Sequence, residues 1–164
     1  MSRLLVLFFA SGCAALIYET VWFYLVQLVV GASSISVAVL LCAFMGGMAL
    51  GSWLLTRVTP KDAHPLRVVA ALEVGIAALG VIIPIALPWI QQAYLTLAEP
   101  GSSAVMLRAL VCFLVLTPPT MLMGATLPAI ARGYQSASAR SVGLIYMANL
   151  AGGATGTLLA MSGP

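Results

Sequence analysis

Two carboxylates, Glu19 and Glu73, lie inside long apolar stretches of the sequence. Glu19 precedes the end of the first stretch, at Val30, by about 11 residues, or about 16 Å of helix at 1.5 Å per residue. That depth places Glu19 near the middle of a bilayer. An ionisable residue at the centre of a membrane helix costs about 2.5–3.5 kcal/mol on insertion scales, so such residues are candidates for function.

Glu19 shares one helical face with Gly12 and Ala15, and Gln27 lies close to that face. Small residues of membrane helices face other helices, so we expect Glu19 to point into a helix bundle. Its carboxyl group could handle a cation or a proton, or act as a polar lock to a partner. A purely structural hydrogen bond is an equally good interpretation.

Glu73 is shallower, because it follows Arg67 by about six residues, or about 9 Å of helix. It shares a face of small residues with Ala77 and Gly80. From there its carboxylate could reach the membrane interface or pair with a basic residue. A structural role is therefore favoured for Glu73, and a cation site remains the alternative.

Residues for catalysis or metal binding are missing. His64 is the only histidine of the chain, so neither a metal cluster nor a catalytic triad can be assembled from it. Cys13, Cys42 and Cys112 each lie within apolar runs, where cysteine packs as a small hydrophobic residue. The sequence therefore predicts no enzyme, no catalytic residue, no metal and no cofactor.

The composition indicates a membrane protein. The chain has 62% hydrophobic and 7% charged residues, with a mean hydropathy of +1.11, whereas a soluble domain carries roughly a quarter charged residues. A chain of 164 residues accommodates five or six spans of about 20 residues. The net charge is +3, and the basic residues lie at the expected helix ends. They are therefore interpreted as topology signals. We expect membrane lipids as partners and no nucleic acid.

The apolar stretches predict an all-α bundle of about five transmembrane helices in a single domain, 1–164. The expected helices are 4–30, 36–55, 68–89, 104–131 and 141–160. With the N-terminus inside, the basic residues of the inner side are Arg3, Arg57, Lys61, Arg67, Arg132 and Arg140, and only Arg108 lies toward the other side. Because basic residues favour the cytoplasmic side, we expect a cytoplasmic N-terminus and an outside C-terminus.

The second and fifth stretches resemble each other when the sequence is shifted by 105 residues. Each carries an Ala-x3-Gly-x3-Gly ladder, formed by Ala43, Gly47 and Gly51 and by Ala148, Gly152 and Gly156. Small residues four apart let neighbouring backbones approach closely. The two stretches cross the membrane in opposite directions, so the pattern predicts an inverted three-helix repeat that lacks its sixth helix.

Prolines interrupt the fourth stretch at Pro118, Pro119 and Pro128. A kink is expected there, with threonine hydroxyl groups bonding the carbonyl groups that the prolines leave free.

Several segments resemble the membrane portion of bacterial spermidine-synthase-like fused proteins. They are Phe9-Ala-Ser-Gly-Cys-Ala-Ala-Leu-Ile-Tyr-Glu-Thr-Val-Trp22, Ala43-Phe-Met-Gly-Gly-Met-Ala-Leu-Gly-Ser-Trp-Leu54, Leu72-Glu-Val-Gly-Ile76, Pro118-Pro-Thr-Met-Leu-Met-Gly-Ala-Thr-Leu-Pro128 and Leu144-Ile-Tyr-Met-Ala-Asn-Leu-Ala-Gly152. The resemblance implies helices like half of a major-facilitator transporter, without the soluble synthase domain. It also adds Asn149 to Glu19 and Glu73 as a position that matches the family.

Three functions are expected from these features. The first is a non-catalytic accessory or structural subunit in the bacterial cytoplasmic membrane, which docks through its ladders to other membrane protein subunits or to a homo-oligomer. The second is a transporter-like half that binds a cation or a polyamine at Glu19 and Glu73. The third is the membrane anchor of a split aminopropyltransferase-like enzyme.

Overall fold

The computed structural model describes residues 2–30, 34–60, 63–97, 102–133 and 139–162, and these residues form helices and no strand. The helices are α1 (Ser2–Val30), α2 (Ser34–Val58), α3 (Pro65–Leu97), α4 (Ser102–Gly133) and α5 (Ala139–Met161). All five are long and apolar enough to cross a membrane. The predicted bundle of five transmembrane helices is therefore confirmed.

The largest error in the predicted boundaries is at the end of α3. The sequence placed that end near Trp89, whereas α3 continues to Leu97 with Pro84 and Pro88 inside it. A proline removes one backbone hydrogen bond, but a continuous helix still satisfies more backbone groups in lipid than an irregular segment does. The other boundaries differ from the prediction by three residues or fewer.

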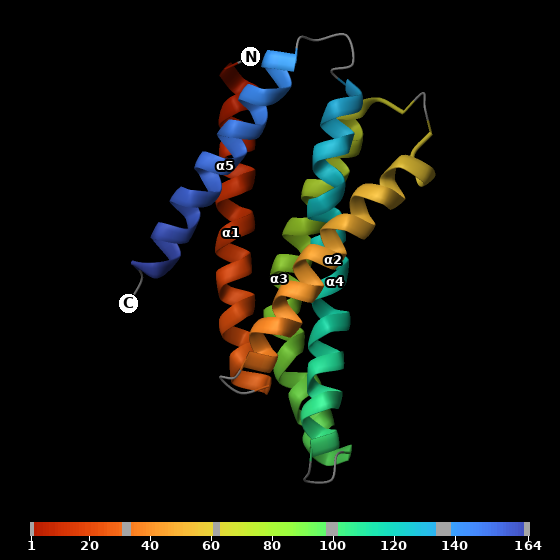
Figure 1. The fold of residues 1–164 in the computed structure, drawn as a ribbon, viewed down its shortest axis with the longest axis vertical. Helices are drawn as coiled ribbons and strands as arrows, with labels where there is room; N and C mark the ends of the chain where they lie inside the picture. The colour runs from red at the N-terminus through yellow and green to blue at the C-terminus, as the bar shows by residue number, and fades with distance from the viewer. Residues whose placement is uncertain (1, 31–33, 61–62, 98–101, 134–138, 163–164) are drawn as a thin grey trace.

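Successive helices run in opposite directions across the bundle (Figure 1). The start of α1, the end of α2, the start of α3, the end of α4 and the start of α5 therefore lie at the same end of the molecule. Each of these helix ends carries one arginine: Arg3, Arg57, Arg67, Arg132 and Arg140. We call this end of the bundle the arginine end.

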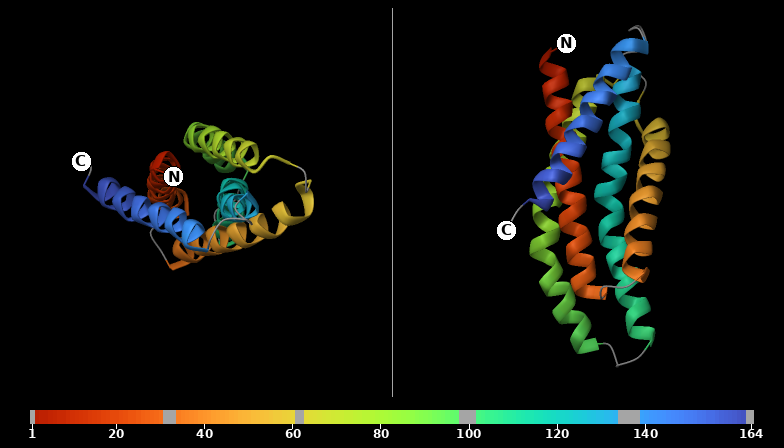
Figure 2. Two further views of the ribbon diagram at one scale, coloured as in Figure 1. Left: turned by 90° about the horizontal axis from the view of Figure 1, so that it is seen from above. Right: turned by 60° about the vertical axis from the view of Figure 1, so that its left-hand side comes forward.

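Two helix pairs, α1 with α5 and α2 with α4, form the closest contacts, and the chain runs in the same direction in both helices of each pair (Figure 1). Helix α3 packs on α4 (Figure 2). The ladder glycines lie in these contacts. A Cβ atom on Gly47 would overlap the Thr120 hydroxyl group, and one on Gly51 would overlap the Met121 carbonyl oxygen. In the other pair, Cβ atoms on Gly152 and Gly156 would overlap the carbonyl oxygens of Phe9 and Cys13.

The ladder alanines differ in burial. Ala43 is fully buried at the α2–α4 contact, where its carbonyl oxygen lies 3.0 Å from the Thr120 hydroxyl oxygen, whereas Ala148 is half-buried. Both ladders are thus filled by helices of the same chain. A partner protein would therefore have to bind a surface other than the two ladders, which the sequence had indicated as docking surfaces.

The two helix pairs correspond to each other along the chain. The backbone carbonyl groups nearest to Gly47 and Gly51 belong to Thr117 and Met121, whereas those nearest to Gly152 and Gly156 belong to Phe9 and Cys13. The partner residues on α4 follow those on α1 by 108 positions, close to the 105 that separate the ladders. Because α1 and α4 run in opposite directions, this is the relation that an inverted repeat produces.

Two apolar clusters hold the described helices together. One contains Trp22, Phe44, Ile83 and Leu116 and, by their positions along the helices, lies toward the end opposite the arginine end. The other contains buried residues near the arginine end: Phe8, Leu55, Val69, Ala125, Ala129, Ile130 and Ile145. Ser11 and Glu19 on α1 and Glu73 on α3 lie between these clusters along their helices.

Candidate intramembrane cation site

Glu19 of α1, Glu73 of α3 and Asn149 of α5 line a single cavity of about 330 Å³. We call it the intramembrane cavity. The sequence assigned the two glutamates to separate helices and gave no distance between them. The helix arrangement brings both carboxyl groups and the Asn149 carboxamide to one cavity.

Ser11 connects two of the helices that form the cavity. Its hydroxyl group donates a hydrogen bond of 2.6 Å to Oε1 of Glu73, so it joins α1 to α3. Among the described residues Glu73 makes no ion pair with a basic residue, although its depth had allowed one. The sequence analysis did not single out Ser11. Its position eight residues before Glu19, two helical turns along the same face, was the signal that could have found it.

Glu19 makes no hydrogen bond and no ion pair with any residue that the structure describes, and its side chain is half-buried. Ala15, from the predicted small-residue face, lines the cavity beside it. Gly12 instead lies against Asn149 at the α1–α5 contact, and Gln27 is not part of the cavity. The Glu19 carboxyl group is therefore available to a ligand inside the membrane.

Asn149 is positioned by the contact between α1 and α5. Its Nδ2 atom donates a hydrogen bond of 3.2 Å to the carbonyl oxygen of Phe8. This bond uses part of the donor capacity of the amide nitrogen, and the carboxamide oxygen remains an acceptor. Asn149 is thus a neutral polar residue in the lining of the cavity that Glu19 and Glu73 also line.

The rest of the lining is neutral, since no lysine, arginine or histidine is among the described residues of the cavity. Its other members include Tyr18, Thr126, Met45, Met48 and Met123. A second cavity of about 400 Å³ shares Met48, Met123, Thr126 and Asn149 with it. Among the described residues no cluster of three or more His, Cys, Asp or Glu side chains could hold a metal ion.

The threonines of α4 do not act as the sequence predicted. Pro118, Pro119 and Pro128 leave the carbonyl groups of Leu114, Val115 and Gly124 without their usual partners. The hydroxyl groups bond other carbonyl groups: Thr117 to Phe113 at 2.7 Å, Thr126 to Met123 at 2.7 Å and Thr120 to Leu116 at 3.0 Å. A threonine reaches back three or four positions from its own place on the helix. Thr117 follows Leu114 by three positions but bonds Phe113 instead, and no threonine follows Val115 or Gly124 at that spacing.

The chain matches no family model, no curated protein and no solved structure. Any functional conclusion therefore rests on the cavity and on the helices that build it.

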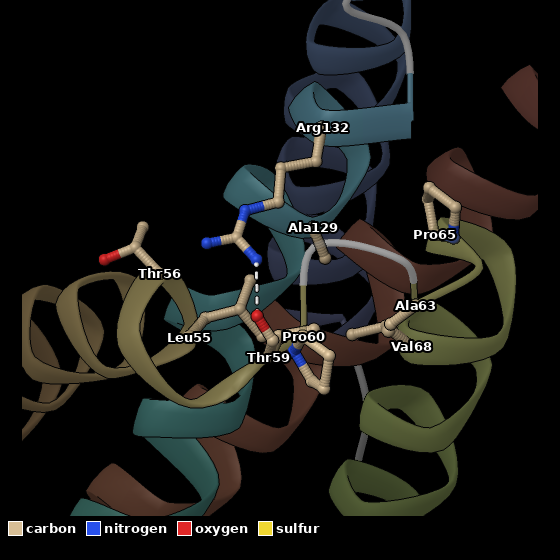
Figure 3. A pocket seen from close by; sticks show the side chains of 9 residues that line it. All are labelled: Leu55, Thr56, Thr59, Pro60, Ala63, Pro65, Val68, Ala129 and Arg132. Carbon is tan, nitrogen blue, oxygen red and sulfur yellow. Dashed lines mark hydrogen bonds between the residues drawn. The ribbon is translucent and has the colours of Figure 1, made fainter.

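A separate pocket of about 410 Å³ lies at the arginine end, between the end of α2, the start of α3 and the end of α4 (Figure 3). We call it the arginine-end pocket. Arg132 lies along its edge and donates a hydrogen bond of 3.4 Å from Nη1 to the carbonyl oxygen of Thr59. This pocket shares no residue with the intramembrane cavity.

Proposed function

We propose that the chain is a transporter-like membrane module that binds a cation in the intramembrane cavity. The observation that carries the proposal is the meeting of Glu19 and Glu73 in one cavity whose described lining has no basic side chain. Two carboxyl groups inside a membrane are costly unless they are neutral or compensated by a positive charge. A bound cation supplies that charge.

The lining offers the hard oxygen ligands that an alkali-metal cation or an organic ammonium group takes. The carboxylates and the oxygen atoms of Ser11, Thr126 and Asn149 are hard ligands, and an ammonium group can donate three hydrogen bonds to such acceptors. A volume of about 330 Å³ is at the lower end of the range for small-molecule sites, so a slender amine fits it. The resemblance to spermidine-synthase-like membrane portions favours a polyamine among the amines.

Thermal unfolding of the purified protein in detergent tests the proposal. We expect spermidine or sodium to raise the unfolding temperature in a saturable way at constant ionic strength. A ligand at a hundred times its Kd stabilises the folded state by about 2.7 kcal/mol. The double variant Glu19→Gln/Glu73→Gln keeps the shape of both side chains, so it should fold and lose this stabilisation.

Thr20→Val is the matched control. The Thr20 hydroxyl bonds the carbonyl oxygen of Leu16 within the same helix, at 2.8 Å, and Thr20 does not line the cavity. This variant should keep the cation-dependent shift. An equal shift in the double variant and the wild type would show that cations act elsewhere, and the proposed function would then be wrong.

In this proposal the chain lies in the bacterial cytoplasmic membrane with a cytoplasmic N-terminus and an outside C-terminus. The positive-inside rule places the arginine end in the cytoplasm. Single cysteines at Ser34, Ala63, Ser102 and Ser136, in a variant without the native cysteines, test this orientation. An impermeant thiol reagent added outside should label positions 34 and 102 and should miss 63 and 136. Labelling of the opposite pair would invert the topology.

An accessory subunit is the second candidate, and an exposed face of α1 favours it. Ala129 of α4 is 2% exposed, whereas its counterpart on α1, Val21, is 41% exposed. At this position the described helices cover α4, and they leave the corresponding position of α1 exposed. A helix of another membrane protein could pack there. A wild type that shows no cation-dependent stabilisation but purifies in a stable complex through this face would favour the accessory role.

A further inference from the structure

We propose that the arginine-end pocket binds the phosphate group of an anionic amphiphile, with Arg132 as the residue that contacts the phosphate. This inference concerns a different pocket from the cation site and does not depend on it.

The first observation is the state of the Arg132 guanidinium group. A guanidinium carries five N–H donors, and the described contacts of Arg132 use one of them in the long bond to Thr59. No described carboxylate pairs with it. The guanidinium lies at the mouth of the pocket beside the end of α2 (Figure 3). Its remaining donors match the oxygen atoms of a phosphate, which arginine binds in a bidentate manner.

The second observation is the charge around the pocket. The N-terminus of α3, with Ala63 and Pro65, forms one wall, and the start of a helix carries a partial positive charge. Arg57 and Arg67 belong to the same end of the bundle. Lys61 and Asp62 lie outside the described residues, and their formal charges cancel. The ends of α2 and α4 also line the pocket and carry the opposite partial charge. The preference for an anion therefore rests on the Arg132 guanidinium group, with the other arginines of this end adding to the positive charge around it.

The third observation is the apolar part of the lining. Leu55, Val68 and Ala129 form the side of the pocket that lies deeper in the bundle. A pocket with a cationic mouth and an apolar interior at a membrane surface suits a phospholipid, whose phosphate lies above its hydrocarbon. Inorganic phosphate offers the same anion without the apolar part. The two sources can be separated by experiment.

Arg57 provides the matched control for Arg132. It lies at the same end of the bundle, but its guanidinium group stacks 4.1 Å above the centre of the Trp53 ring and does not line the pocket. Both arginines contribute equally to the general surface charge. Only Arg132 reaches the pocket, so the two substitutions should differ if the pocket is the binding site.

Native mass spectrometry of the detergent-solubilised protein with added phosphatidylglycerol or phosphatidylcholine tests the inference. We expect phosphatidylglycerol to bind preferentially, Arg132→Gln to weaken its binding about tenfold and Arg57→Gln to weaken it less than threefold. Arg132→Lys, which retains the charge and loses the bidentate geometry, should fall between. Thermal unfolding without lipid shows whether each variant is folded.

Competition with inorganic phosphate identifies the source of the anion. If millimolar phosphate displaces phosphatidylglycerol from the wild type, the site recognises the phosphate group alone. If it does not, the apolar part of the lipid contributes and the ligand is the lipid. Equal loss in Arg132→Gln and Arg57→Gln, or equal binding of the two lipids to the wild type, would overturn the inference.

Discussion

Replacing Gly47 with leucine is expected to unfold the protein or to lower its stability severely, whereas replacing the adjacent Gly46 is expected to be tolerated. A side chain at Gly47 meets Thr120, which is 0% exposed. Thr120 cannot turn away without giving up the contacts of its hydroxyl oxygen with the Ala43 and Leu116 carbonyl groups. At Gly46, by contrast, no atom lies within 4 Å of an added Cβ.

The size of this effect follows from overpacking. Forcing additional carbon atoms into a filled contact costs about 1–3 kcal/mol and sometimes more, and here α2 and α4 would have to separate. A surface substitution such as Gly46→Leu changes stability by about 0.5 kcal/mol or less. Thermal unfolding in detergent, together with the yield of monodisperse protein, measures both variants.

The α1–α5 pair allows the same comparison. Gly152 lies against the Phe9 backbone, whereas Gly143, on the same helix, has no atom within 4 Å of an added Cβ. We therefore expect Gly152→Leu to be as damaging as Gly47→Leu, and Gly143→Leu to be harmless. Equal stability of all four variants would mean that the two helix pairs are not in close contact.

The sequence predicted the helices well because their signal is local. An apolar stretch of about 20 residues is sufficient to identify a membrane span, and the ladders indicated which helix faces approach one another. The sequence did not indicate that each ladder packs on a helix of the same chain. That pairing depends on which helices are neighbours, and the spacing of small residues on one helix contains no information about its partner.

The candidate site was predicted only in part for a similar reason. Intramembrane acidic residues are conspicuous, so Glu19 and Glu73 could be found one at a time. Their presence in one cavity depends on the way α1 and α3 are placed around α4, which no motif encodes. Ser11 was missed because a serine in a membrane helix usually bonds its own backbone. Here its partner is the carboxyl group of Glu73, 62 positions away in the sequence.

Chemical modification of Glu19 and Glu73 tests the central claim most directly. A hydrophobic carbodiimide reacts with protonated carboxyl groups inside membranes, and a bound cation protects a carboxylate because it keeps that group ionised and occupied. We therefore expect modification of Glu19 in the protein without added cation, since the Glu19 carboxyl has no hydrogen-bond partner among the described residues. Glu73, which accepts the Ser11 hydrogen bond, should react more slowly.

The measurement is the rate at which mass spectrometry detects the adduct at each glutamate, with and without cation. Saturating spermidine or sodium should slow modification of Glu19 at least about tenfold. The cation concentration that gives half of the maximal protection should agree with the one that gives half of the maximal rise in unfolding temperature. The Thr20→Val control should show the same protection. If Glu19 is modified at the same rate with and without every cation tested, the cavity does not bind a cation and the central claim is contradicted.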